Sequence, residues 1–111
     1  MQHPEPAERI AQSLLAVTLS AASAVEFGDW ETAGQLLRRR EQLLTQLEAC
    51  DDLDSAVSTL EAVQSAEKDL ESLIERTTFE AVEGMQSTRA FREARRAYRP
   101  SAGGGIFDQA G

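Results

Sequence analysis

Residues 53–85 read LDSAVSTLEAVQSAEKDLESLIERTTFEAVEGM, and this stretch decides the fold class. One row of side chains recurs at spacings of three and four residues, with Glu67 interrupting it: Leu53, Ala56, Leu60, Val63, Leu70, Ile74, Thr77, Ala81 and Met85. A period near 3.5 residues over several turns is typical of a coiled-coil-like helix. No segment shows the sustained alternation of apolar and polar residues that indicates a strand. We therefore predict one long helix here.

The sequence on either side of this stretch predicts further helices. Residues 7–99 contain no proline and three glycines, and they are rich in the residues that favour helices. The predicted fold is all-α, an antiparallel helical hairpin or bundle of three to four helices with a long third helix. It forms one domain, residues 1–100, and a flexible Gly-rich tail follows over 101–111. The approximate predicted helices are 5–27, 30–50, 53–83 and 85–99.

Local signals set the predicted helix ends. Gly28 suits the left-handed conformation that ends a helix, and Asp29 is a good N-cap for the next one. Gly84 is a plausible hinge, because the apolar phase changes after it. Pro100 disfavours helix at the preceding residue. The fourth segment is therefore predicted to be a separate helix or a continuation of the third.

The charge is strongly acidic and unevenly distributed. The net charge is −8, so phosphate repels the chain and we expect no nucleic-acid partner. Residues 41–83 hold twelve acids against Lys68 and Arg76, whereas residues 89–99 hold five arginines against Glu93. Segments of opposite sign can pair within one molecule or across two. We expect the arginine-rich segment to fold back on the acidic third helix or to meet an acidic protein partner.

The sequence lacks the usual components of a catalytic or metal site. Cys50 is the single cysteine, and His3 is the single histidine, placed near the end of the chain. We therefore predict no enzyme activity, no metal and no cofactor. No apolar run approaches a membrane span, and the first residues lack the features of a secretory signal. We expect a cytoplasmic protein without a membrane partner.

Two charged residues interrupt apolar rows. Arg40 falls on the main stripe of the second predicted helix, as Glu67 does on that of the third. The simplest interpretation of Arg40 is that its aliphatic stem packs against the core and its guanidinium reaches a carboxylate.

Bulky apolar residues outside the main rows suggest a surface for a partner helix. The candidate partner-binding residues are Leu60, Val63, Leu70, Leu73, Ile74, Phe79, Val82 and Met85. A candidate regulatory helix carries Phe91, Ala94 and Tyr98 on one line. Ile106 and Phe107, after the glycines, are either a docking peptide or a frayed end. Packing of these residues against the first helix or a second copy of the chain is an equal alternative to partner binding.

Several short segments resemble FliT-type flagellar export chaperones. The resemblance covers the chain in length and helix order. At residue level it rests on Gly28-Asp29-Trp30-Glu31, Leu36, Arg40-Glu41, Leu43-Leu44, Ala97-Tyr98-Arg99-Pro100 and Ile106-Phe107-Asp108. The last two segments also resemble the ends of FlgN-like proteins.

This resemblance implies a chaperone that binds the C-terminal helical region of a flagellar axial protein, either the filament cap or a hook-associated protein. Binding would prevent premature assembly and deliver the client to the export ATPase and gate. In the FliT type the last helix can cover the client groove, and residues 85–98 match that helix in position. The alternative function is a self-associating structural coiled coil or adaptor, a homodimer without an export client.

Overall fold

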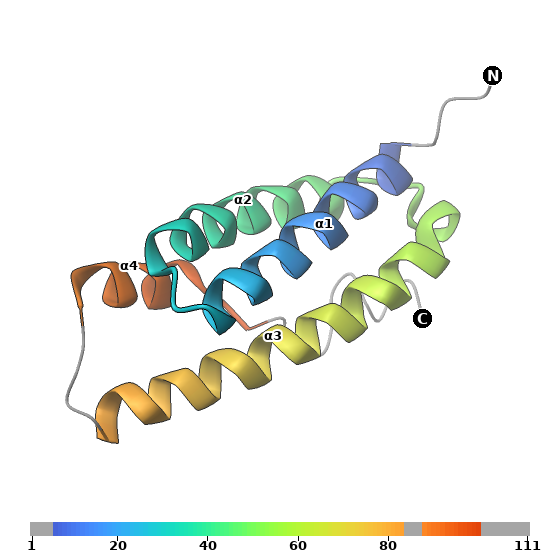
Figure 1. Ribbon diagram of the computed structural model, residues 1–111. Helices are drawn as coiled ribbons and strands as arrows, with labels where there is room; N and C mark the ends of the chain where they lie inside the picture. Colours follow the sequence, from blue (N-terminus) through green and yellow to red (C-terminus); the bar gives the residue numbers. More distant parts are fainter. Residues whose placement is uncertain (1–5, 84–87, 101–111) are drawn as a thin grey trace.

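The computed structural model describes residues 6–83 and 88–100, with the backbone alone described for 81–83. The chain is all-α, as predicted, and its third helix is the longest (Figure 1). The elements are α1 (Pro6–Glu26), α2 (Trp30–Glu48), the short 3-10 helix η1 (Leu53–Ala56), α3 (Val57–Glu83) and α4 (Arg89–Ala97).

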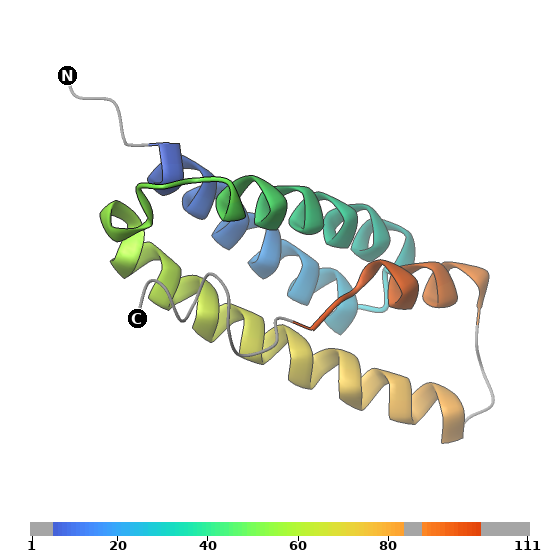
Figure 2. The same cartoon turned by 180° about the vertical axis from the view of Figure 1, so that it is seen from behind.

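The three long helices pack side by side in alternating directions, with α1 in contact with both α2 and α3 (Figure 1). The short α4 packs on α2, and the reverse view shows it beside the beginning of that helix (Figure 2). None of the helices in the described part of the chain combines the length and hydropathy needed to span a bilayer.

The turn between α1 and α2 forms where the sequence predicts it. Gly28 has a φ of 73°, and the amide of Asp29 donates to the carbonyl of Ala24 at 2.9 Å. The Asp29 carboxylate accepts a hydrogen bond from the backbone N–H of Thr32 at 3.3 Å and thereby caps α2. Both features satisfy helix-end groups that would otherwise lack partners.

The fourth helix is shorter than the predicted 85–99. Thr88 is extended, and its hydroxyl accepts a hydrogen bond from the N–H of Phe91 at 3.0 Å. This N-cap starts α4 at Arg89 and separates it from α3, so the two helices are not continuous. At the other end Tyr98 is extended, two residues before Pro100. The predicted hinge at Gly84 and the start at Met85 lie outside the described residues, as does the predicted tail.

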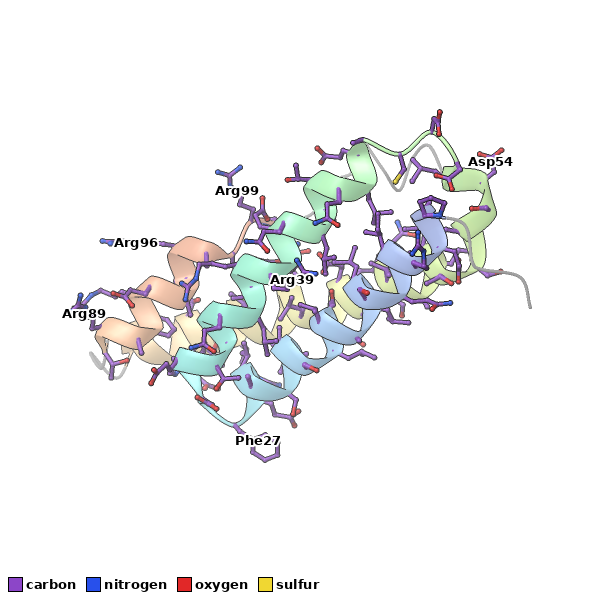
Figure 3. The ribbon with its side chains drawn as sticks, turned by 90° about the horizontal axis from the view of Figure 1, so that it is seen from above. Phe27, Arg39, Asp54, Arg89, Arg96 and Arg99 are labelled. Atoms are coloured by element: carbon purple, nitrogen blue, oxygen red, sulfur yellow. The ribbon has the colours of Figure 1, made fainter. Side chains whose placement is uncertain are left out.

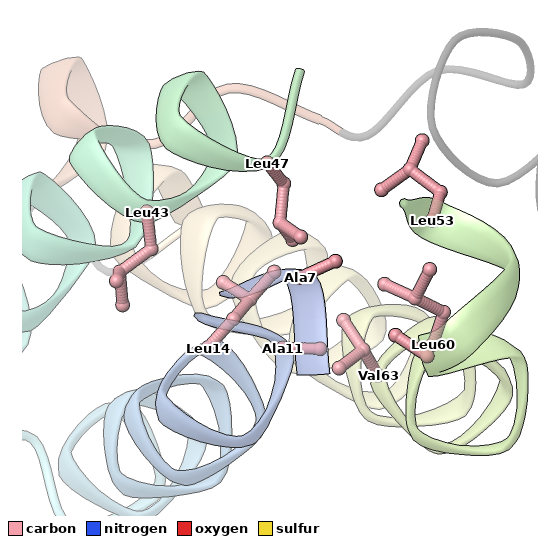
Figure 4. Close-up of a cluster of buried hydrophobic side chains, with 9 residues drawn as sticks. Ala7, Ala11, Leu14, Leu43, Leu47, Leu53, Leu60 and Val63 are labelled. Carbon is pink, nitrogen blue, oxygen red and sulfur yellow. The ribbon is translucent and has the colours of Figure 1, made fainter. Parts of the chain in front are cut away.

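The core consists of two apolar clusters. The first joins α1, α2, η1 and α3 at the end where α1 begins (Figure 4): Ala7, Ala11, Leu14, Leu43, Leu47, Leu53, Ala56, Leu60 and Val63. The second lies at the other end and includes residues from α4: Ala21, Ala24, Val25, Ala33, Leu37, Leu70, Ile74, Ala94 and Tyr98. Alanine is frequent in α1, and small side chains let helices approach closely.

A buried polar layer separates the two clusters. Thr18, Arg40 and Glu67 occupy the same level of α1, α2 and α3, and all three are buried. The apolar rows of the three helices are thus interrupted at matching heights. Burying a charge is costly unless it is paired and hydrogen-bonded, so these residues must satisfy one another.

Candidate functional site

Arg40 and Glu67 form an ion pair at the centre of the bundle. Their side chains are 0% and 2% exposed. Nε of Arg40 donates to Oε2 of Glu67 at 2.8 Å and to Oε1 at 3.0 Å, and Nη2 donates to Oε1 as well. The Thr18 hydroxyl donates to Oε2 at 3.1 Å. The predicted carboxylate partner of Arg40 therefore exists, but the guanidinium lies in the interior and does not extend to water.

The other side of the guanidinium faces Tyr98, which follows α4, and Glu41 of α2. The ring of Tyr98 lies over Arg40, with 5.2 Å from the guanidinium carbon to the ring centroid. Nη1 of Arg40 lies 3.5 Å from Oε2 of Glu41, and neither atom has a hydrogen-bond partner within the described residues. Attraction to the ring and to this carboxylate therefore compensates the charge on this side.

The pKa shifts of this group follow from its burial and charges. Burial alone would lower the pKa of Arg40, but the hydrogen bonds and charge of Glu67 outweigh it and raise that pKa. Burial raises the pKa of Tyr98 to about 12, with the Glu71 carboxylate adding to the shift and the Arg40 guanidinium opposing it. Arg40 is therefore a permanent cation, and Tyr98 stays neutral at ordinary pH.

The helix α4 lies against α2 through its apolar face. Phe91 meets Trp30 edge to face, with ring centroids 4.8 Å apart. Gly34 faces Ala94 so closely that a Cβ built on Gly34 would lie 3.6 Å from the Cα of Ala94. A cleft of about 300 Å³ remains beside this contact, lined partly by Trp30, Arg38 and Arg89.

Several arginines of α4 and of the residues after it point away from the bundle. Figure 3 shows Arg89, Arg96 and Arg99 projecting from its outer side. Arg99 approaches Glu41 of α2 at 3.8 Å, and Arg95 donates to the hydroxyl of Thr78 in α3 at 3.0 Å. The main contact of this segment is with α2, so the expectation that it folds back on the acidic α3 is wrong for that contact. The apolar face of α4 fits α2, and exposed ion pairs contribute too little to redirect it.

The predicted partner-binding residues fall into three groups. Leu60 and Val63 are buried in the first cluster, and Leu70 and Ile74 are buried in the second. Leu73 is half-buried against the second cluster, whereas Phe79 is 66% exposed. The remaining two, Val82 and Met85, have side chains outside the described residues.

The three residues predicted on the regulatory helix, Phe91, Ala94 and Tyr98, are brought together on one buried face. The second core cluster contains Ala94 and Tyr98 together with Leu70 and Ile74 of α3. Undocking α4 therefore uncovers part of the surface that the sequence predicted for a partner.

Sequence reasoning missed Gly34, Thr18 and Phe27. Gly34 lies inside a predicted helix, four residues after Trp30, and a glycine in such a place can indicate that another helix approaches closely. Thr18 gave no signal of its own. Phe27 is 82% exposed at the α1–α2 turn (Figure 3), beside a cleft of about 400 Å³ that Trp30 and Phe91 also line.

Similarity to known proteins identifies a family for this chain. The family described as "Flagellar protein FliT" matches residues 8–100, which include all four α-helices apart from the first two residues of α1. No curated protein and no solved structure matches at a significant level. The matched range covers most of the 111 residues, including the buried polar layer and α4. The chain therefore belongs to the FliT family of flagellar proteins.

Proposed function

We propose that this protein is a cytoplasmic chaperone of type III flagellar export. Its client is the C-terminal helical region of an axial protein, either the filament cap or a hook-associated protein. The chaperone keeps the client from assembling early and delivers it to the export ATPase and gate. Family membership supports a role in flagellum biogenesis as a chaperone rather than as an enzyme.

The observation that carries the proposal is that a short amphipathic helix, α4, covers an apolar groove on α2. An amphipathic helix from a partner binds such a groove through its apolar face. The groove includes Trp30 and Leu37 of α2, and Leu70 and Ile74 of α3 share its cluster. We infer that α4 is a lid and that the client helix takes its place.

The short length of α4 favours its displacement. The helix α4 has nine residues, Arg89 to Ala97, so it is too short to be stable alone in water and depends on its contact with α2. A side-chain hydrogen bond from Arg95 to Thr78 also joins it to α3. A client helix that buries a similar apolar area can therefore replace it without unfolding the three long helices.

Within this proposal the predicted residues differ in role. Leu70, Leu73 and Ile74 belong to the cluster that α4 covers, and they are proposed to contact the client. Leu60 and Val63 pack against α1 in the other cluster, so they support the groove. Phe79 extends the proposed surface toward the end of α3, whereas Val82 and Met85 stay sequence-based candidates whose side chains lie outside the described residues.

The alternative of a self-associating coiled coil would use Leu60, Val63, Leu70 and Ile74. These side chains are buried inside a single chain. A dimer through them would require the bundle to open, so we favour the chaperone.

Binding to the axial proteins encoded in the same genome tests the proposal. Purified C-terminal segments of the filament-cap and hook-associated proteins should bind at micromolar concentration or tighter in calorimetry. Removal of residues 85–111 should strengthen binding, whereas removal of 101–111 alone leaves α4 in place and serves as the control. Absence of binding to every axial protein at tens of micromolar (about −6 kcal/mol) would rule out the proposed client class. Unchanged affinity after the longer truncation would refute the lid.

A further inference from the structure

The contact between α4 and α2 has a regular pattern along both helices. Phe91 contacts Trp30, Ala94 contacts Gly34, and Tyr98 covers Arg40. The residue numbers of the contacting partners increase together along the two helices, so α4 runs in the same direction as α2. The contacting positions are i and i+3 on α4 and i+7 at Tyr98, the extended C-cap residue directly after it, and this spacing follows one face of a helix.

The middle position accepts only a small residue. A Cβ built on Gly34 would lie 3.6 Å from the Cα and 3.7 Å from the Cβ of Ala94, at ordinary van der Waals contact. Alanine therefore fits at position 34 as well as at position 94, but a longer side chain at either position has no room unless the helices separate. Ala94 is itself 1% exposed. The two helices thus meet closely at one point, and this point fixes their register.

The last position favours an aromatic ring. Arg40 is fully buried, and its Nη1 has no hydrogen-bond acceptor within the described residues, although Oε2 of Glu41 lies 3.5 Å away. The π face of Tyr98 supplies negative potential at this place, which an aliphatic side chain of equal size does not. Leucine here would leave the buried cation poorly compensated on one side.

We propose that the α2 groove, formed by Trp30, Gly34 and Arg40, selects partner helices by a three-point pattern. The partner carries an aromatic residue, a small residue three positions later and a second aromatic residue four positions after that, and it runs parallel to α2. Gly34 and Arg40 are the specificity-determining residues. The helix α4 carries this pattern within the chain. The inference rests on the proposed function only in naming the export client as the natural partner.

The test uses the full-length chain with α4 displaced by a change outside the groove. Ala94→Leu places a large side chain against Gly34 and should undock α4 while leaving the groove intact. Trp30 is the only tryptophan, so its fluorescence reports the loss of Phe91. A synthetic peptide of residues 88–100 with the natural sequence should then bind this variant and restore the fluorescence of the wild-type chain.

Three matched comparisons test the pattern itself. The peptide with Ala94→Leu should bind at least about tenfold more weakly, as overpacking predicts. The peptide with Tyr98→Leu should also lose affinity, whereas Tyr98→Phe keeps the ring and should bind well. In the chain, adding Gly34→Leu to Ala94→Leu should abolish binding of the natural peptide, whereas adding Gly34→Ala should preserve it.

Each contrary result overturns a stated part. Unchanged Trp30 fluorescence in the Ala94→Leu chain would refute the requirement for a small residue. Equal binding of the Tyr98→Leu and Tyr98→Phe peptides would refute the role of Arg40. Failure of the natural peptide to bind an undocked, folded chain would overturn the groove as a recognition site.

The outcome is separable from that of the proposed function. Binding of the peptide without binding of any axial protein would refute the chaperone function and support the three-point pattern. Binding of an axial protein that is unaffected by Gly34→Leu would support the chaperone function and refute the pattern as the means of client selection.

Discussion

Replacing Arg40 with methionine removes the cation of the buried polar layer and leaves its volume nearly filled. Glu67 then loses three hydrogen bonds and keeps the one donated by the Thr18 hydroxyl. A carboxylate that is 2% exposed cannot recover these bonds from water. The variant should therefore be strongly destabilised, more than a surface Arg→Met change such as Arg39→Met, which serves as the control.

The expected magnitude follows from the geometry of the pair. Breaking a fully buried ion pair by removing one partner costs about 3–5 kcal/mol. A domain of this size has a total stability of roughly 5–15 kcal/mol, so a large share would be lost. Removing both charges, with Arg40→Met and Glu67→Met together, should return the stability to within about 1 kcal/mol of wild type or above it. The Thr18 hydroxyl can then bond to the backbone of its own helix.

Urea unfolding followed by circular dichroism measures these differences. The single variant should unfold at a much lower urea concentration, with an unchanged slope. The double variant should restore the midpoint, and with the Glu67→Met single variant measured as well, the sum of the two single losses should exceed the loss in the double variant by several kcal/mol, at least about 5. A single variant that loses less than about 1 kcal/mol, or a double variant no more stable than the single, would refute the description of this pair.

Three further changes test other contacts. The raised folded pKa of Tyr98 means that its stabilising effect is complete below pH 10 and is lost as the pH rises toward 12. Tyr98 is the only tyrosine, so tyrosinate absorbance follows it directly, and a midpoint at 10 would contradict its burial. Gly34→Ala should raise the unfolding free energy by about 0.5–1 kcal/mol, because the added methyl fits and glycine weakens a helix. A lower unfolding free energy, measured with urea, would contradict this. Asp29→Ala should lower it by about 1 kcal/mol through loss of the N-cap, and no change in thermal unfolding would show that the cap contributes little.

The periodicity of the sequence was sufficient to predict the fold class and the helix order. The apolar rows run at helical spacing, and Gly28 and Asp29 mark the first turn by their backbone chemistry. The start of α4 was predicted too early. Thr88 caps that helix through a side-chain hydrogen bond, a local signal that the preceding change of apolar phase obscured.

The candidate site was harder to predict because it depends on which helices become neighbours. Arg40 and Glu67 were each visible as interruptions, yet they are 27 positions apart and nothing local indicated that they pair. The charge pattern suggested α3 as the neighbour of α4. Packing at Gly34 and Trp30 placed it on α2, since burial of an apolar face outweighs exposed charge attraction.

Hydrogen exchange with and without a bound axial-protein helix tests most directly whether α4 and the client compete for one groove. On saturation with the client, the amides of Arg89–Ala97 should exchange faster, while those of α2 from Trp30 to Glu41 become at least as protected as before. Undiminished protection of α4 in the saturated complex would contradict this account.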